Sequence, residues 1–153
     1  MPAAFPLAPS MQRALALAEA AAANGEVPIG AVVTVGERIV GEGRNAMRGT
    51  ADPTAHAEVV ALRAAARTLA TSRLDGCTLW VTLEPCAMCA AAASLARIAR
   101  LVFGAEDPKG GAVVHGPRLY AQPTCHHRPE VVGGVGEAAA ARLLRTFFQE
   151  RRT

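Results

Sequence analysis

Two short segments of the chain carry side chains that together suit a catalytic zinc site. The first places His56 two residues before Glu58, and the second places Cys86 three residues before Cys89. One imidazole and two thiolates supply three zinc ligands, which leaves a fourth coordination position for water. Zinc lowers the pKa of such a water towards about 7, and Glu58 remains free to move protons. The pattern therefore predicts an open, catalytic metal site.

Local sequence indicates how two helix ends could bring these residues together. The two cysteines share one face of a helix that Pro85 would start, and a helix N-terminus favours the thiolate that binds zinc. His56 and Glu58 would point to nearly opposite sides of a regular helix. Both can face the metal only if His56 lies at an irregular helix entrance, which we expect Thr54 to cap. Two helix N-termini are thus predicted to converge on the metal.

A closed structural zinc site is the competing interpretation, and it would recruit Cys77, Cys125 or His126 as a fourth ligand. Cys77 falls in an expected buried strand, where a cysteine is usually a small core residue. His126 and His127 beside Cys125 are not taken as a second metal site, because loop histidines are more often hydrogen-bonded surface residues. The Cys-x-x-Cys spacing favours metal chemistry over disulfides, which predicts a cytoplasmic protein.

Composition is that of one globular domain, and we expect a single zinc-dependent domain over residues 1–153. Apolar residues make up 51% of the 153 residues, but none of their runs reaches the about eighteen that a membrane span needs. Residues 1–9 lack the basic n-region of a signal peptide. The formal charge of +3 is compatible with a polyanionic partner without demanding one.

Hydrophobic periodicity and turn residues predict helices that alternate with strands, which is typical of a layered α/β domain. The expected helices are 10–25 with Ser10 as cap, 55–70, 85–96 and 138–151. The expected strands are 31–35, 38–42, 77–83, 100–103 and 131–132. Segments 43–53 and 104–129 are expected to be loops, and long loops inside compact domains are often functional.

The His-x-Glu and Pro-Cys-x-x-Cys pair is the signature of zinc deaminases that act on nucleobases. Beyond this pair, most of the chain resembles the TadA-type tRNA-specific adenosine deaminases of the cytidine deaminase-like superfamily. The stretches that carry the resemblance are 26–32, 52–58, 81–90 and 102–105, together with Asn45, Asp107 and the paired leucines and phenylalanines near the C-terminus.

The resemblance implies a three-layer α/β/α fold with a central mixed five-stranded sheet flanked by helices. It also implies a homodimer, one Zn²⁺ per chain, and conversion of adenosine to inosine at the wobble position of a tRNA anticodon. Carried over by position, His56, Cys86 and Cys89 bind the zinc, and Glu58 shuttles protons.

The same resemblance implies a pocket for an extruded base. Asn45 would bond the base edge, and Asp107 would accept from a ribose 2′-hydroxyl, which favours RNA. Adjacent helical residues diverge by about 100°, so one of Phe147 and Phe148 should be buried; we assign Phe148 to the pocket rim. The residues implied to line the pocket are Val27, Ile29, Ala57, Leu83 and Glu84, the last three through their main chain.

Candidates for phosphate contacts are Arg44, Arg48, Lys109, Arg145, Arg151 and Arg152. The chain departs from the family pattern over 111–129, which leaves the substrate contacts of that segment open. Deamination of a free base, nucleoside or nucleotide of guanine or cytosine type is the alternative, because the same zinc chemistry serves it. A non-catalytic zinc-stabilised RNA-binding module is a third class, which Glu58 argues against because a structural site has no need of a carboxylate beside the metal.

Overall fold

The computed structural model describes residues 6–151, so Arg152 and the first five residues of the N-terminal segment lie outside the described part. Its strands are β1 (Gly30–Val35), β2 (Arg38–Arg44), β3 (Thr78–Leu83), β4 (Arg100–Ala105) and β5 (Glu130–Val132). Its helices are α1 (Pro9–Ala23), α2 (Met47–Thr50), α3 (Ala57–Leu69), α4 (Ala87–Leu95), α5 (Glu137–Arg151) and the 3₁₀ turn η1 (Leu119–Ala121).

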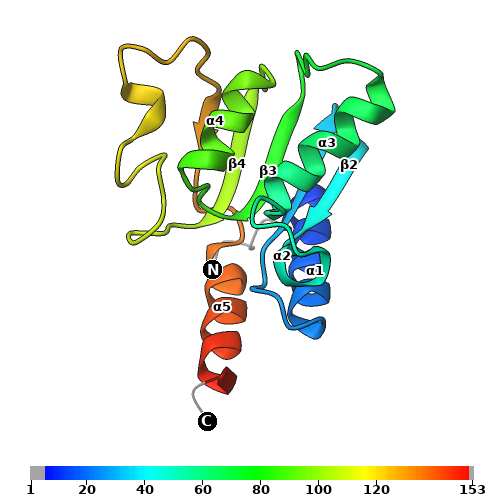
Figure 1. The fold of residues 1–153 in the computed structure, drawn as a ribbon, viewed down its shortest axis with the longest axis vertical. Helices are drawn as coiled ribbons and strands as arrows, with labels where there is room; N and C mark the ends of the chain where they lie inside the picture. Colours follow the sequence, from blue (N-terminus) through cyan, green and yellow to red (C-terminus); the bar gives the residue numbers. More distant parts are fainter. Residues whose placement is uncertain (1–5, 152–153) are drawn as a thin grey trace.

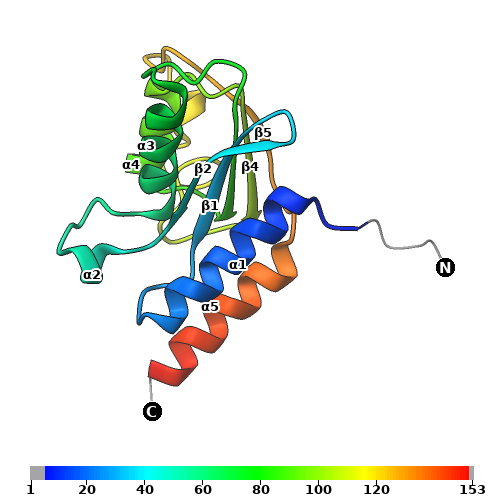
Figure 2. The ribbon, with the colours of Figure 1, turned by 90° about the vertical axis from the view of Figure 1, so that its right-hand side faces the viewer.

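The strands form one mixed sheet in the order β2-β1-β3-β4-β5. β1 runs antiparallel to both of its neighbours, whereas β3, β4 and β5 run parallel. Helices α1 and α5 cover one face of this sheet, and α3 and α4 cover the other (Figures 1 and 2). This confirms the predicted three-layer α/β/α architecture. No helix within residues 6–151 is long and apolar enough to cross a membrane.

Close packing of α3 on β2 depends on two glycines. A Cβ atom at Gly41 would lie 2.4 Å from the carbonyl oxygen of Ala61, and one at Gly43 would lie 2.2 Å from that of Ala57. Side chains at these two positions would therefore push the helix away from the strand. Because Ala57 is the first residue of α3, the close contact at Gly43 lies at the start of that helix.

Two predicted helix caps are wrong. Ala8, not Ser10, precedes α1, and Pro9 takes the first helical position, where its missing N–H costs nothing. Thr54 does not cap α3, because the helix begins later, at Ala57, with His56 as its N-cap residue. The Thr54 hydroxyl instead donates to Asp52 Oδ1 at 2.7 Å. Neither of the two N-cap residues, Ala8 and His56, makes a cap hydrogen bond with its own side chain.

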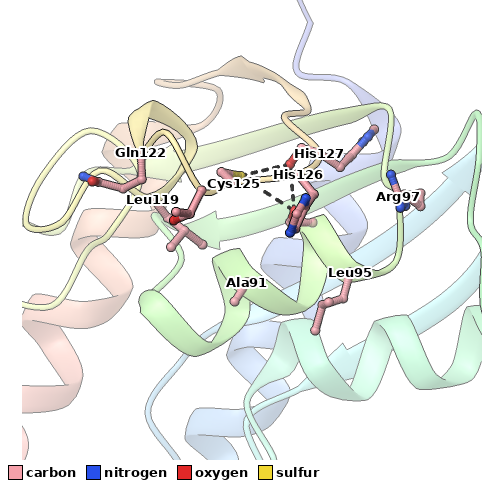
Figure 3. A pocket seen from close by; sticks show the side chains of 10 residues that line it. Ala91, Leu95, Arg97, Leu119, Gln122, Cys125, His126 and His127 are labelled. Carbon is pink, nitrogen blue, oxygen red and sulfur yellow. Dashed lines mark hydrogen bonds between the residues drawn. The ribbon is translucent and has the colours of Figure 1, made fainter.

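The two expected loops contain more structure than their sequences indicate. Segment 43–53 includes the end of β2 and the short helix α2, whose N–H groups at Arg48 and Gly49 donate to the buried Glu26 carboxylate. Segment 104–129 includes the end of β4 and the turn η1. It lies over α4, and Figure 3 shows its Cys125, His126 and His127 around a cavity of about 340 Å³.

Candidate active site

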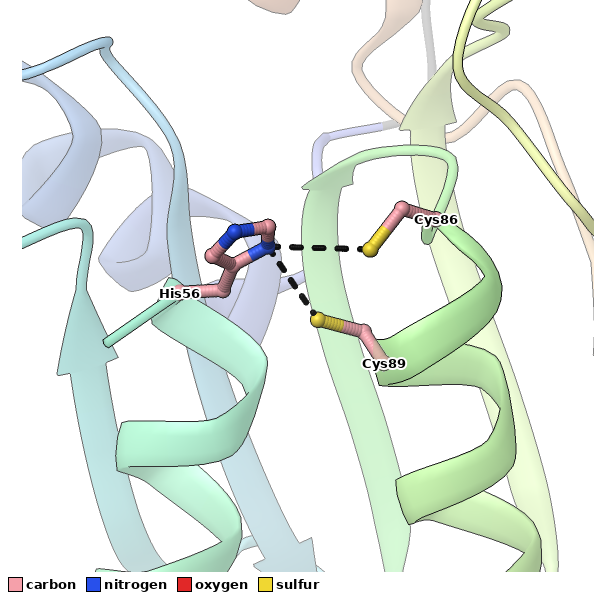
Figure 4. Close-up of side chains that lie close together, drawn as sticks. All are labelled: His56, Cys86 and Cys89. Atoms are coloured by element: carbon pink, nitrogen blue, oxygen red, sulfur yellow. Dashed lines mark hydrogen bonds between the residues drawn. The ribbon is translucent and has the colours of Figure 1, made fainter. Parts of the chain in front are cut away.

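His56, Cys86 and Cys89 converge where α3 and α4 begin. His56 and Cys86 are the N-cap residues of the two helices, and Cys89 lies in the first turn of α4. The His56 Nδ1 atom is 3.6 Å from the Cys86 Sγ atom and 3.5 Å from the Cys89 Sγ atom, and all three atoms lie within 4.8 Å of one another (Figure 4). As predicted, His56 sits at the irregular entrance of its helix.

This spacing fits a tetrahedral zinc ion. Bonds of about 2.05 Å to nitrogen and 2.3 Å to sulfur at a tetrahedral angle put the two ligand atoms about 3.5 Å apart. The measured nitrogen–sulfur distances are 3.5 and 3.6 Å. Within residues 6–151 this is the one group of three or more metal-ligating side chains. It has three members, which matches an open site.

None of the residues considered for a closed site joins this group. Cys77 is fully buried in the core. Cys125 Sγ donates to the His127 carbonyl oxygen at 3.2 Å, and the His127 ring donates from Nε2 to the Ile98 carbonyl oxygen at 2.7 Å. The neighbouring histidine, His126, is exposed. The interpretation of these loop histidines as hydrogen-bonded or exposed residues agrees with the structure.

The pKa values of the two cysteines are shifted in opposite directions. The pKa of Cys86 falls to about 5, chiefly because Cys89 hydrogen-bonds to its sulfur and because N–H groups of the first turn of α4 point at it. The pKa of Cys89 is raised in turn by the same hydrogen bond and by burial. A thiolate at neutral pH is the form that binds a metal.

Glu58 lies beside the cysteines and is 4% exposed. Burial raises the pKa of its carboxyl group to about 7, although its own backbone N–H and the nearby His56 favour the charged form. The carboxyl group also interacts with the Cys89 side chain. A carboxyl group that exchanges protons near neutral pH, next to a metal site, suits general acid–base catalysis.

A groove of about 560 Å³ opens onto His56. Six residues predicted to bind substrate line it, namely Val27, Ile29, Asn45, Leu83, Asp107 and Phe148. Lys109, predicted as a phosphate contact, lines it as well. Sequence reasoning missed Met47, Glu106 and Leu144. Leu144 could have been found, because it lies four residues before Phe148 and so shares its helix face.

The prediction that one of the two adjacent phenylalanines is buried while Phe148 lies at the pocket rim is confirmed. Phe147 is 6% exposed and packs in the core, whereas Phe148 is 47% exposed and reaches the groove. Their rings meet edge to face with centroids 5.4 Å apart. The guanidinium of Arg151 lies 3.9 Å from the Phe147 ring centroid, so this arginine is already engaged in a cation–π contact.

Asn45 and Glu84 are both buried, but they act differently. The Asn45 Oδ1 atom accepts the Ala57 N–H at 2.9 Å and so fastens the start of α3. Its Nδ2 atom has no partner among residues 6–151 and is not buried, so it is free to face the groove. Neither Glu84 nor Ala57 is among the side chains that line the groove. The Glu84 carboxylate instead binds the loop that follows β4. Burial raises the pKa of this carboxyl group, but the Asp107 N–H, the His115 side chain and the N–H groups of Val113 and Val114 together lower it by more.

A mixed sheet in this order, two helix N-termini that present His, Cys and Cys, and a buried glutamate beside them define a hydrolytic enzyme of the cytidine deaminase-like fold. A solved structure from biochemical and structural studies of A-to-I editing by tRNA:A34 deaminases at the wobble position of transfer RNA has the same fold. It superposes with a TM-score of 0.87 and 50% identity over 88% of this chain and 98% of that one.

The profile of the MafB19-like deaminase family matches residues 8–152. The tRNA-specific adenosine deaminase of Agrobacterium fabrum is 51% identical over 142 residues, which is 93% of each chain. The guanine deaminase of Bacillus subtilis is more distant, with 30% identity and a TM-score of 0.65 over 94% of this chain and 92% of that one. The chain therefore belongs to the MafB19-like deaminase family, and its resemblance to the tRNA-specific adenosine deaminases is confirmed.

Proposed function

We propose that this enzyme converts adenosine to inosine at the wobble position of a tRNA anticodon. The observation that carries the proposal is the groove that joins His56 to the Asn45 and Asp107 side chains, in a chain half-identical to tRNA-specific adenosine deaminases. The reaction consumes water and releases ammonia. A base stacked in a helix could not reach His56 within the groove, so the target adenosine must be unstacked.

We further propose that His56, Cys86 and Cys89 hold one Zn²⁺ per chain. Bound zinc would supply a water molecule whose pKa is lowered towards about 7. Glu58 would take one proton from the attacking water and deliver it to the ring nitrogen next to the reacting carbon. It would then take the second proton from the hydroxyl group added to that carbon and deliver it to the departing amine. Burial of this carboxyl group keeps the proton in the site rather than in bulk solvent.

The groove walls orient the base. Val27, Ile29 and Leu83 supply apolar surface against its faces, and the Asn45 Nδ2 atom supplies a donor for its edge. Asp107 Oδ1 already accepts the N–H groups of Lys109 and Gly110. Its Oδ2 atom is left to accept from a ribose 2′-hydroxyl, a group that DNA lacks.

Aromatic and basic side chains around the groove suit the rest of an anticodon loop. The exposed ring of Phe148 offers a stacking surface for a neighbouring base. Lys109 lies in the groove itself, and Arg44, Arg48 and Arg145 are exposed. We propose that these cations contact phosphates.

Mass analysis of nucleosides after incubation with zinc-loaded protein tests the proposal. An anticodon stem-loop with adenosine at the wobble position should yield inosine, whereas free adenosine should not react. The likeness to a guanine deaminase makes a free base the alternative substrate. Turnover of guanine, cytosine or a free nucleoside, with none of the stem-loop, would replace our proposal by that alternative. Binding of the stem-loop without ammonia release from any substrate would indicate a non-catalytic module.

We also propose a single domain that acts in the cytoplasm, where tRNA is modified, as a homodimer. The outer face of α3 and α4 supports the dimer, because Leu95 is 81% exposed there beside a shallow apolar cavity lined by Val59, Leu62, Ala92 and Ala96. Sedimentation should give a dimer for the wild type and a monomer for Leu95→Glu. A monomeric wild type would refute the dimer.

A further inference from the structure

The loop 106–115 forms one side of the groove and is folded around a single carboxylate. Glu106, Asp107 and Lys109 line the groove from this loop. Glu84, which directly follows β3, buries its side chain completely behind them. It therefore touches the back of the loop rather than the groove.

Five hydrogen bonds join the Glu84 carboxylate to this loop. Its Oε1 atom accepts the Asp107 N–H at 3.0 Å, and lies 2.8 Å from His115 Nδ1, which donates to it. Its Oε2 atom accepts the N–H groups of Val113, Val114 and His115 at 3.1, 3.0 and 3.2 Å. Successive backbone N–H groups that point at one anion form a concave anion-binding nest, here occupied by a side chain of the same protein.

The fit between loop and carboxylate leaves no spare room. A Cβ atom at Gly111 would lie 2.4 Å from Glu84 Oε2, so a side chain at this position would displace the loop. The next residue, Ala112, donates its N–H to the Pro85 carbonyl oxygen at 2.9 Å. The loop is thus tied to the strand end from which the cysteine segment begins.

We propose that Glu84 and His115 are positioning residues that fix Asp107 and Lys109 in the groove and thereby set the affinity for RNA. This inference rests on the proposed function. Glu84 holds the Asp107 backbone directly, and the Asp107 side chain then orders the Lys109 N–H. His115 supplies the one side-chain donor of the nest. It lies in the segment where the chain departs from the family pattern, so the nest gives that segment a role.

Substitutions at His115 test the proposal without removing the buried carboxylate. His115→Ala deletes the Nδ1 donor and keeps the four backbone N–H bonds. His115→Asn places an amide N–H where Nδ1 stood. We expect the alanine variant to raise KM for the anticodon stem-loop roughly tenfold with kcat within about twofold, and the asparagine variant to restore KM. His126→Ala is the matched control, because His126 is an exposed histidine of the same long segment and should change neither constant.

Hydrogen exchange provides a readout that does not need a substrate. Amides of the peptide 106–116 should exchange faster in His115→Ala and faster still in Glu84→Gln, whose new amide would face N–H donors. Unchanged exchange in His115→Ala would overturn the proposal, as would a lower Tm with unchanged KM. If Glu84→Gln does not fold, KM and hydrogen exchange of the two His115 variants are sufficient to test the proposal. If wild-type protein leaves the stem-loop unreacted, the proposed function fails, whereas the exchange result still tests the positioning of the loop.

Discussion

The close contact between Gly43 and the start of α3 predicts that a side chain at this position would displace the helix that carries the site residues. A Cβ atom at Gly43 would lie 2.2 Å from the Ala57 carbonyl oxygen, 2.6 Å from the Ala61 N atom and 3.0 Å from the Val60 Cβ atom. Two of these three neighbours are backbone atoms, which cannot rotate away. Gly43→Ala should therefore force α3 and β2 apart by about 1 Å to reach ordinary contact distance.

The cost of this shift can be estimated. Overpacking of a core contact costs about 1–3 kcal/mol, and in a domain of this size each kcal/mol lowers Tm by about 2–4 °C. The same shift moves His56 and Glu58 and strains the 2.9 Å hydrogen bond from the Ala57 N–H to Asn45. A misplacement of about 1 Å costs on the order of a hundredfold in rate, so kcat should fall more than stability alone explains.

Thermal unfolding, zinc content and stem-loop deamination of the zinc-loaded variants provide the assay. Gly41→Ala is the matched control, because its Cβ atom would lie 2.4 Å from the Ala61 carbonyl oxygen, one turn farther along α3. It should lower Tm comparably but leave more activity per folded molecule. A Gly43→Ala protein with wild-type Tm and kcat would refute the argument, and so would equal losses of kcat in the two variants.

Three further substitutions and metal removal give independent predictions. Glu58→Ala should lower kcat by at least about a hundredfold, because general acid–base catalysis contributes that much, while zinc content by atomic absorption stays at the wild-type level; loss of zinc would show that Glu58 is a ligand. Phe148→Ala should raise KM for the stem-loop about tenfold through lost base stacking, with Tm lowered by only a few degrees through loss of the edge-to-face contact with Phe147. Phe147→Ala should instead lower the free energy of unfolding by about 3 kcal/mol, so equal effects of the two variants would contradict their assignment. Treatment with a chelator should lower Tm, because the proposed zinc would hold the starts of two helices together; an unchanged Tm would count against that role.

Much of the fold was predictable because its signals are local. The strand from Thr78 to Leu83 is rich in β-branched residues, and its boundaries agree within one residue with the prediction. The convergence of His56 with the two cysteines followed from helix geometry, since the spacing of His56 and Glu58 required an irregular entrance. These features depend on a few neighbouring residues.

The missed features depend on contacts between distant segments. Helix α2 is fastened by Glu26, which precedes it by more than twenty residues, so its short sequence gave no sign of a helix. Thr54 resembled a cap, but Asp52 takes its hydroxyl and Asn45 takes the first N–H of α3 instead. The long side chain of Glu84 turned away from the groove because the loop 106–115 supplies its donors.

The positions of the three proposed metal ligands in the chain tie metal affinity to the order in which the fold assembles. His56 precedes β3 and the cysteines follow it, so the ligand set spans the central strand of the sheet. A peptide that carries only Cys86 and Cys89 offers two ligands, and the third arrives only when α3 has docked on β2. Tight metal uptake during refolding would therefore report a completed tertiary structure. A chain that has not yet inserted β3 into the sheet would bind the metal only weakly.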